Sequence, residues 1–154
     1  MNFIRFVFLP SLLLFSFSLK AEEIDFNGKD ILIGKYLEMA EDTNNSYEFP
    51  NFPTSTKFVR SEFETPNLGL SKSTYWIKFT VRNVSEDPKI FLELAYPMLH
   101  SCELYSLDSG KVENRSILET YSFSEREVNH QSIVFKLLIG KNASKTFFLT
   151  GTYS

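Results

Sequence analysis

The stretch from residue 71 to residue 106 constrains the fold more than any other part of this chain. Within residues 75–83, bulky apolar side chains alternate with mostly polar ones, and the alternation returns in residues 90–95 and 99–107. A period of two is typical of a strand that buries one face. The sequence therefore predicts three consecutive β-strands with tight connections.

Four further strands are predicted in residues 35–41, 111–120, 132–139 and 144–152. Short strands at close intervals, separated by turn residues, are typical of an all-β sandwich. No segment has the length and period of a helix that would compete with this interpretation.

Residues 47–67 interrupt the pattern. Pro50, Pro53 and Pro66 have no backbone N–H to donate to a central ladder, so we expect an edge segment followed by a surface crossing. Four phenylalanines are expected to pack this segment onto the core: Phe49, Phe52, Phe58 and Phe63.

Residues 1–21 have the features of a secretory signal peptide: an early basic residue, an apolar run, and Ala21 before an acidic start. The apolar run is shorter than the roughly 20 residues that span a membrane; an uncleaved anchor is the alternative. Cleavage would leave residues 22–30 as a lead-in and residues 31–154 as one domain, in the periplasm or outside the cell.

Charge and cysteine content narrow the function. The chain has 16 Lys and Arg against 19 Asp and Glu, for a net charge of −3. This balance argues against a nucleic-acid partner, because such proteins carry basic patches. Cys102 is the only cysteine, so it forms no intrachain disulfide, and we interpret it as a small core residue. A reactive thiol or an intermolecular bridge is the alternative role.

No motif for catalysis or for cofactor binding is present. The chain has neither a glycine-rich phosphate loop nor a nucleophile elbow. His100 and His130 do not combine with Cys102 in a zinc-binding spacing, and no oxygen-rich loop has the register of a calcium site. We therefore predict no enzyme activity, no metal and no cofactor.

Four motifs in order carry a family resemblance: PNLGLSKSTYWIKFTVRN, FLELAYPMLHSCELYS, YSFSEREVNHQSIVFKL and KTFFLTGTYS. Together they resemble the extracellular sensor domain of the 7TMR-DISM receptors, in its second extracellular type, over about residues 31–154. The resemblance implies a jelly-roll-like β-sandwich similar to carbohydrate-binding modules, with a sensory rather than catalytic role.

The chain departs from that family in two places. The stretch LETYSFSEREVNH lacks the Gly-Asp pair before the Ser-x-Arg loop and the Pro after its Arg, which puts the geometry of the ligand loop in doubt. In the family, a seven-helix membrane region follows this module, often with a kinase or cyclase domain. Because this sequence ends at Ser154, we expect a stand-alone exported copy or a truncated receptor.

The candidate ligand-binding residues are Trp76, Glu103, Tyr105 and Arg126. Trp76 lies on the strand face opposite the predicted core and is either a stacking platform or itself packed. Glu103 and Tyr105 share an outward face, as a sugar site or as an ordinary solvated surface. Arg126 matches the loop arginine of the family, and its guanidinium suits carboxylates or hydroxyls. Its alternative role is a salt bridge that pins the loop, to Glu125, Glu127 or Glu103.

Three functions follow from these observations. The first is a non-catalytic sensory domain that binds a carbohydrate-like small molecule and signals through a membrane receptor, a histidine kinase or a diguanylate cyclase. The second is a protein–protein interaction module or a truncated receptor ectodomain. The third and least favoured is a glycoside-acting jelly-roll enzyme. It would need paired carboxylates, which only Glu93 and Glu103 on neighbouring strands would supply.

Overall fold

The computed structural model describes residues 22–67, 71–95, 99–118, 125–126 and 128–153. The predicted signal peptide and residues 121–124 and 127 of the loop at residues 121–131 lie outside these ranges. The strands are β1 Glu23–Phe26, β2 Glu38–Asp42, β3 Val59–Arg60, β4 Thr74–Asn83, β5 Lys89–Leu94, β6 Leu99–Asp108, β7 Lys111–Leu118, β8 Ile133–Leu138 and β9 Ser144–Tyr153. The 3-10 turn η1 spans Gly34–Tyr36.

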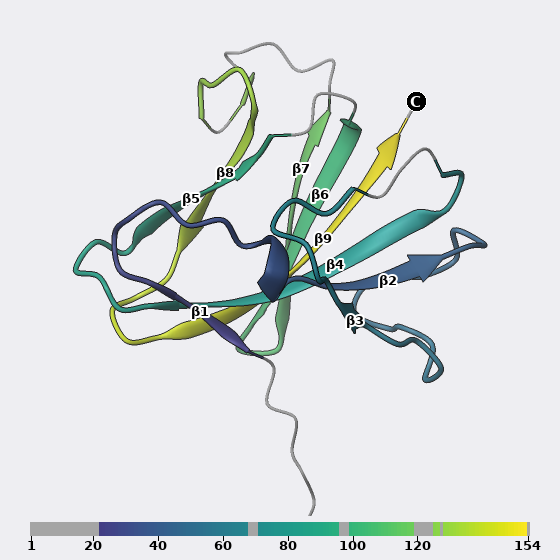
Figure 1. The fold of residues 1–154 in the computed structure, drawn as a ribbon, viewed down its shortest axis with the longest axis horizontal. Helices are drawn as coiled ribbons and strands as arrows, with labels where there is room; N and C mark the ends of the chain where they lie inside the picture. Colours follow the sequence, from purple (N-terminus) through teal and green to yellow (C-terminus); the bar gives the residue numbers. More distant parts are fainter. Residues whose placement is uncertain (1–21, 68–70, 96–98, 119–124, 127, 154) are drawn as a thin grey trace, which may run out of the picture.

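These strands form an all-β sandwich, which confirms the predicted fold class. A seven-stranded sheet has the order β3-β2-β4-β9-β6-β7, and β1 pairs in parallel with β4. Strands β5 and β8 form a separate two-stranded sheet to one side of the larger sheet (Figure 1).

The hydrophobic core lies between the two sheets because alternate residues of each strand point inward. On β8, Phe135 and Leu137 are each 1% exposed, as the alternation in residues 132–139 predicts. They pack in one cluster with Phe79 of β4, Leu104 of β6 and Phe147 of β9.

The three consecutive strands predicted in residues 71–106 exist, but they are not neighbours. Strand β5 belongs to the smaller sheet, and β9 lies between β4 and β6. Asn83 holds the crossing between the sheets. Its side-chain amide donates to the carbonyl oxygens of Asp87 at 2.9 Å and Ile139 at 2.8 Å, and its carbonyl oxygen accepts from the Ser85 amide. Local polar bonds thus turn the chain from one sheet into the other.

The N-terminal part differs from the prediction in two details. Strand β1 forms within residues 22–30, where no strand was predicted. The strand expected at residues 35–41 begins later, at Glu38, after the turn η1. The turn depends on Gly34, because a Cβ there would lie 1.9 Å from the carbonyl oxygen of Glu64.

Residues 47–58, here called the lid segment, cross the outer face of the larger sheet. Phe49, Phe52 and Phe58 make ring contacts there with Trp76 and Phe148, rather than joining the core between the sheets. The prediction that all four phenylalanines pack on the core is therefore wrong. Phe63, the fourth, is 67% exposed.

Candidate functional site

The outer face of the larger sheet carries two rows of side chains that cross the strands. Because Ile77, Leu104 and Leu149 point to the core, the residues that alternate with them point outward. The first row, called the Trp76 row, follows the strand register from β2 to β7: Ala40, Trp76, Thr150, Glu103 and Ser116. The second is Glu38, Lys78, Phe148, Tyr105 and Asn114.

Aromatic rings from the lid segment cover the central part of both rows. The Phe52 ring lies 5.0 Å from Trp76 and 5.5 Å from Phe148, between ring centroids. The Phe49 ring lies 5.1 Å from Tyr105 and 5.0 Å from Phe148. These separations are in the range where aromatic pairs attract each other. We call this cluster the aromatic face; its members are Tyr47, Phe49, Phe52, Phe58, Trp76, Tyr105 and Phe148.

Trp76 is buried, with 4% of its surface exposed, beneath Phe52. Its indole Nε1 has no hydrogen-bond partner, nor does the hydroxyl of Thr150, its neighbour across β4 and β9. Thr150 is 9% exposed. Buried polar groups in proteins are nearly always hydrogen-bonded, so two adjacent exceptions mark this place in the sheet as unusual.

Glu103 and Tyr105 contact each other on the same face. The Tyr105 hydroxyl donates a hydrogen bond of 2.6 Å to Glu103 Oε2. Burial, and then this bond and the Glu103 charge, raise the pKa of Tyr105 to about 12. The Tyr105 ring lies 5.6 Å from Trp76. Three of the four predicted site residues therefore lie together.

A partly buried ion pair borders the aromatic face. Lys78 Nζ lies 2.7 Å from Glu38 Oε2 and 5.8 Å from the centre of the Phe58 ring. The Lys78 charge is thus matched by a carboxylate, which leaves Glu103 as the carboxylate nearest to Trp76 and Thr150 in the strand register.

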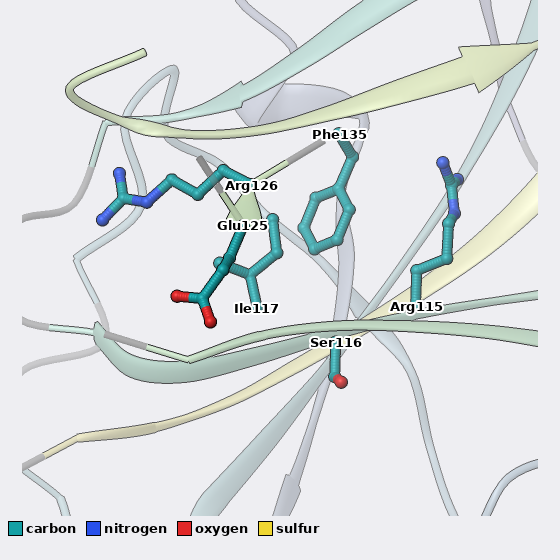
Figure 2. A pocket seen from close by; sticks show the side chains of 6 residues that line it. All are labelled: Arg115, Ser116, Ile117, Glu125, Arg126 and Phe135. Atoms are coloured by element: carbon teal, nitrogen blue, oxygen red, sulfur yellow. The ribbon is translucent and has the colours of Figure 1, made fainter. Parts of the chain in front are cut away.

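Arg126 lies apart from the other three residues. It lines a pocket of about 290 Å³ together with Arg115, Ser116, Ile117, Glu125 and Phe135. Ile117 and Phe135 belong to the core between the sheets, so this pocket lies on the opposite face of the larger sheet from Trp76. The side chain of Ser116, which belongs to the Trp76 row, points away from Ile117 and Phe135 (Figure 2). Figure 2 shows the guanidinium groups of Arg126 and Arg115 on opposite sides of Phe135.

The bonds of Arg126 stabilise its loop. Its Nη1 donates to the carbonyl oxygens of His130 at 3.1 Å and Gln131 at 3.5 Å. Carbonyl oxygens of its own loop therefore bind the guanidinium of Arg126, whether or not a carboxylate also contacts it. Glu103, one of the three carboxylates expected to pair with it, points to the other face and contacts Tyr105 instead. Glu127, another, lies outside the described residues.

The prediction that Glu93 and Glu103 lie on neighbouring strands, as a hydrolase site would require, is wrong. Glu93 is on β5, which pairs with β8, whereas Glu103 is on β6 in the other sheet. The two carboxylates therefore do not lie on neighbouring strands.

Cys102 is 1% exposed within the core, and burial raises the pKa of its thiol to about 12, so the prediction of a small core residue is confirmed.

No group of three or more His, Cys, Asp or Glu side chains among the described residues is arranged to hold a metal ion. Within the same part of the chain, no helix has the length and apolar character needed to cross a bilayer.

Phe148, Thr150 and the rings of the lid segment were not among the site residues predicted from the sequence. Alternation in residues 144–152 places Phe148 and Thr150 opposite the core residues Phe147 and Leu149. The sequence therefore indicates that both residues point outward. It does not indicate that they lie beside Trp76, because that position depends on the pairing of β9 with β4.

One comparison with known proteins gave a match. A family model described as 7TMR-DISM extracellular 2 matches residues 34–152. No curated protein and no solved structure matches the chain.

Proposed function

Because the chain belongs to the 7TMR-DISM extracellular 2 family, whose model covers residues 34–152, we propose that it is a non-catalytic domain that senses a carbohydrate-like small molecule. The family is one of extracellular sensory domains of receptors, so an extracellular sensory role follows from membership itself. What we propose beyond this role is the ligand class, the ligand-binding residues and the signalling partner.

The aromatic face is the observation that carries the proposed ligand class. Half-buried rings of Phe49, Phe52, Phe148 and Tyr105 offer apolar surfaces, and aromatic rings pack well against the C–H faces of sugars. Glu103 lies beside them and accepts hydrogen bonds, as a ligand hydroxyl requires. Trp76, Glu103 and Tyr105 are the proposed contacts. Arg126 is assigned to the shape of its loop.

The proposed output follows from the receptor context of the family. Ligand binding would be transmitted to a membrane receptor, or to a membrane-bound histidine kinase or diguanylate cyclase, from the periplasm or the outside of the cell. No step requires a cofactor, because the role is binding alone.

Titration of a saccharide panel into the exported domain tests this proposal. The panel contains cellobiose, maltose, lactose, xylobiose and chitobiose, and the readouts are calorimetry and melting temperature. At least one sugar should bind, and the Tyr105→Phe and Glu103→Gln variants should each weaken it about tenfold, as expected for one lost hydrogen bond.

A matched control separates these effects from general charge loss. Glu86→Gln removes an exposed carboxylate that pairs with Lys141. Glu86 follows the end of β4 at Asn83, whereas Trp76 is near the start of that strand. This variant should bind as the parent protein does. A well-folded parent protein that binds no sugar of the panel contradicts the carbohydrate-like ligand.

A second function, protein–protein interaction, is favoured by one observation. Phe91 and Leu138 are 58% and 61% exposed. They lie diagonally across β5 and β8 on the solvent face of the smaller sheet. Contiguous apolar patches are typical of interaction surfaces, and these two exposed side chains are neighbours across the two strands. A complex with a receptor ectodomain that is lost in Phe91→Lys but retained in Tyr105→Phe, measured by light scattering after gel filtration, would identify this function.

A further inference from the structure

The Trp76 row contains a series of polar groups that can form hydrogen bonds with adjacent hydroxyl groups of one molecule. Trp76, Thr150 and Glu103 are direct cross-strand neighbours on β4, β9 and β6, and such neighbours have Cβ atoms about 4.5–5.5 Å apart. They present in turn an N–H donor, a hydroxyl and a carboxylate acceptor. The first two are buried and have no partner.

The lid segment is attached to the sheet at its ends but not along its length. At one end, the Tyr47 amide donates to Asp42 Oδ2 at 2.7 Å. At the other, β3 pairs with β2. Between them, no hydrogen bond joins residues 48–58 to the described part of the sheet, and the backbone N–H groups of Phe52 and Thr56 donate to Pro50 and Pro53 within the segment.

Ring contacts alone therefore hold the middle of the lid segment on the Trp76 row. Such contacts are not directional in the way that ladder hydrogen bonds are, so they can be exchanged for contacts with another apolar surface. The Thr56 hydroxyl, on the lid segment itself, is also buried without a partner. Opening the lid would expose polar groups that gain hydrogen bonds and would break no strand pairing.

We infer that the lid segment closes over an internal binding site whose hydrogen bonds are completed by the ligand. The ligand is a neutral molecule with adjacent hydroxyl groups and one apolar face. It accepts a hydrogen bond from Trp76 Nε1, bonds with the Thr150 hydroxyl and donates to Glu103, while its apolar face contacts Phe52. This inference rests on the proposed function, because it assigns the contacts and the gating of the same face.

The charges around the Trp76 row favour a neutral ligand over an anionic one. Glu103 would repel a carboxylate or phosphate placed on the Trp76 row. Lys78, in the neighbouring row, is paired with Glu38 at 2.7 Å and offers little compensation.

Replacing Thr150 with valine tests the unpartnered hydroxyl in the ligand-free protein. Valine has nearly the same shape, so Thr150→Val should remove a buried hydroxyl that bonds to nothing and raise the melting temperature by about 3 °C. Thr146→Val is the matched control on the same strand. Its hydroxyl is hydrogen-bonded to Thr80 Oγ1 at 2.8 Å, so this variant should melt at a lower temperature.

The same variants are then compared in binding. For any sugar of the panel that binds the parent protein, Thr150→Val should weaken binding at least about tenfold, whereas Thr146→Val should bind normally. Trp76 emission should change on binding. A sugar that binds Thr150→Val as tightly as the parent overturns the inference and leaves the proposed function intact.

If no sugar binds, the carbohydrate-like ligand of the proposed function fails, and the ligand-free comparison decides the inference separately. A rise in melting temperature for Thr150→Val with a fall for Thr146→Val supports an incomplete site. A fall in both shows that the Thr150 hydroxyl is bonded in solution and overturns the inference.

Discussion

Replacing Phe52 with alanine removes the ring at the centre of the lid contacts. Its centroid lies 5.0 to 6.3 Å from five other rings, those of Trp76, Phe58, Phe148, Phe49 and Tyr47. A fully buried Phe→Ala change costs about 3–5 kcal/mol. Because Phe52 is only half-buried and the lid segment can settle around the gap, we expect a loss of about 2 kcal/mol in the free energy of unfolding.

Trp76 reports on this change directly, because it is the only tryptophan of the chain. Its indole is buried under Phe52. In Phe52→Ala, Trp76 emission should shift to longer wavelength and acrylamide quenching should increase in native buffer, while the far-ultraviolet circular dichroism stays native. Urea unfolding then measures the loss of stability.

Phe63→Ala is the control, since Phe63 follows the lid segment but is 67% exposed. We expect a stability change within about 0.5 kcal/mol and no change in Trp76 emission. If Phe52→Ala leaves the emission and quenching of Trp76 as they are in the parent protein, the lid segment does not cover the indole and the reasoning is refuted.

Three further predictions concern the core, the titration of the aromatic face and a glycine contact. Cys102, with its pKa at about 12, should resist iodoacetamide at pH 8 in native protein and react fully in guanidinium; rapid native labelling would contradict its burial. Tyr105 has a pKa raised from 10.0 to about 12, so the folded state holds its proton more tightly than the unfolded state does. Its contribution to stability is complete below pH 10 and should be lost as the pH rises through 12. Because the chain has seven tyrosines, the difference in absorbance at 295 nm between the parent protein and Tyr105→Phe follows this titration; a midpoint of the difference at pH 10 would show a solvated hydroxyl. Gly34→Ala places a methyl group 1.9 Å from a backbone oxygen and should destabilise the fold by about 1–3 kcal/mol. Gly140→Ala, with open space around it, should change stability by less than about 0.5 kcal/mol in the same urea experiment.

The strands were predictable because their signal is local. Phe135 and Leu137 are buried as the period of two requires, and the Asp108-Ser109-Gly110 turn, whose residue types favour a tight hairpin, joins β6 to β7. Ser109 and Gly110 both have positive φ, of 51° and 81°, as the tightest hairpins need.

Strand neighbours were not predictable from the same pattern. Alternation shows which residues share a face, but it does not show which strand lies beside it. Insertion of β9 between β4 and β6 brings Thr150 between Trp76 and Glu103. The cover over Trp76 depends on a proline-containing segment that has no period at all, so Phe52 was assigned to the wrong side of the sheet.

The burial of Asn83 limits the hosts in which this protein can be produced. Asn83-Val84-Ser85 is an acceptor sequence for N-linked glycans, which normally lie on surface loops. Here the side chain is 0% exposed, and its amide nitrogen donates to two carbonyl oxygens. A glycan on that nitrogen would remove one donor and would have to fit where no surface exists. In a eukaryotic secretory pathway, each chain modified at Asn83 should therefore fail to fold, whereas replacing Ser85 with alanine should restore secretion by abolishing the acceptor sequence.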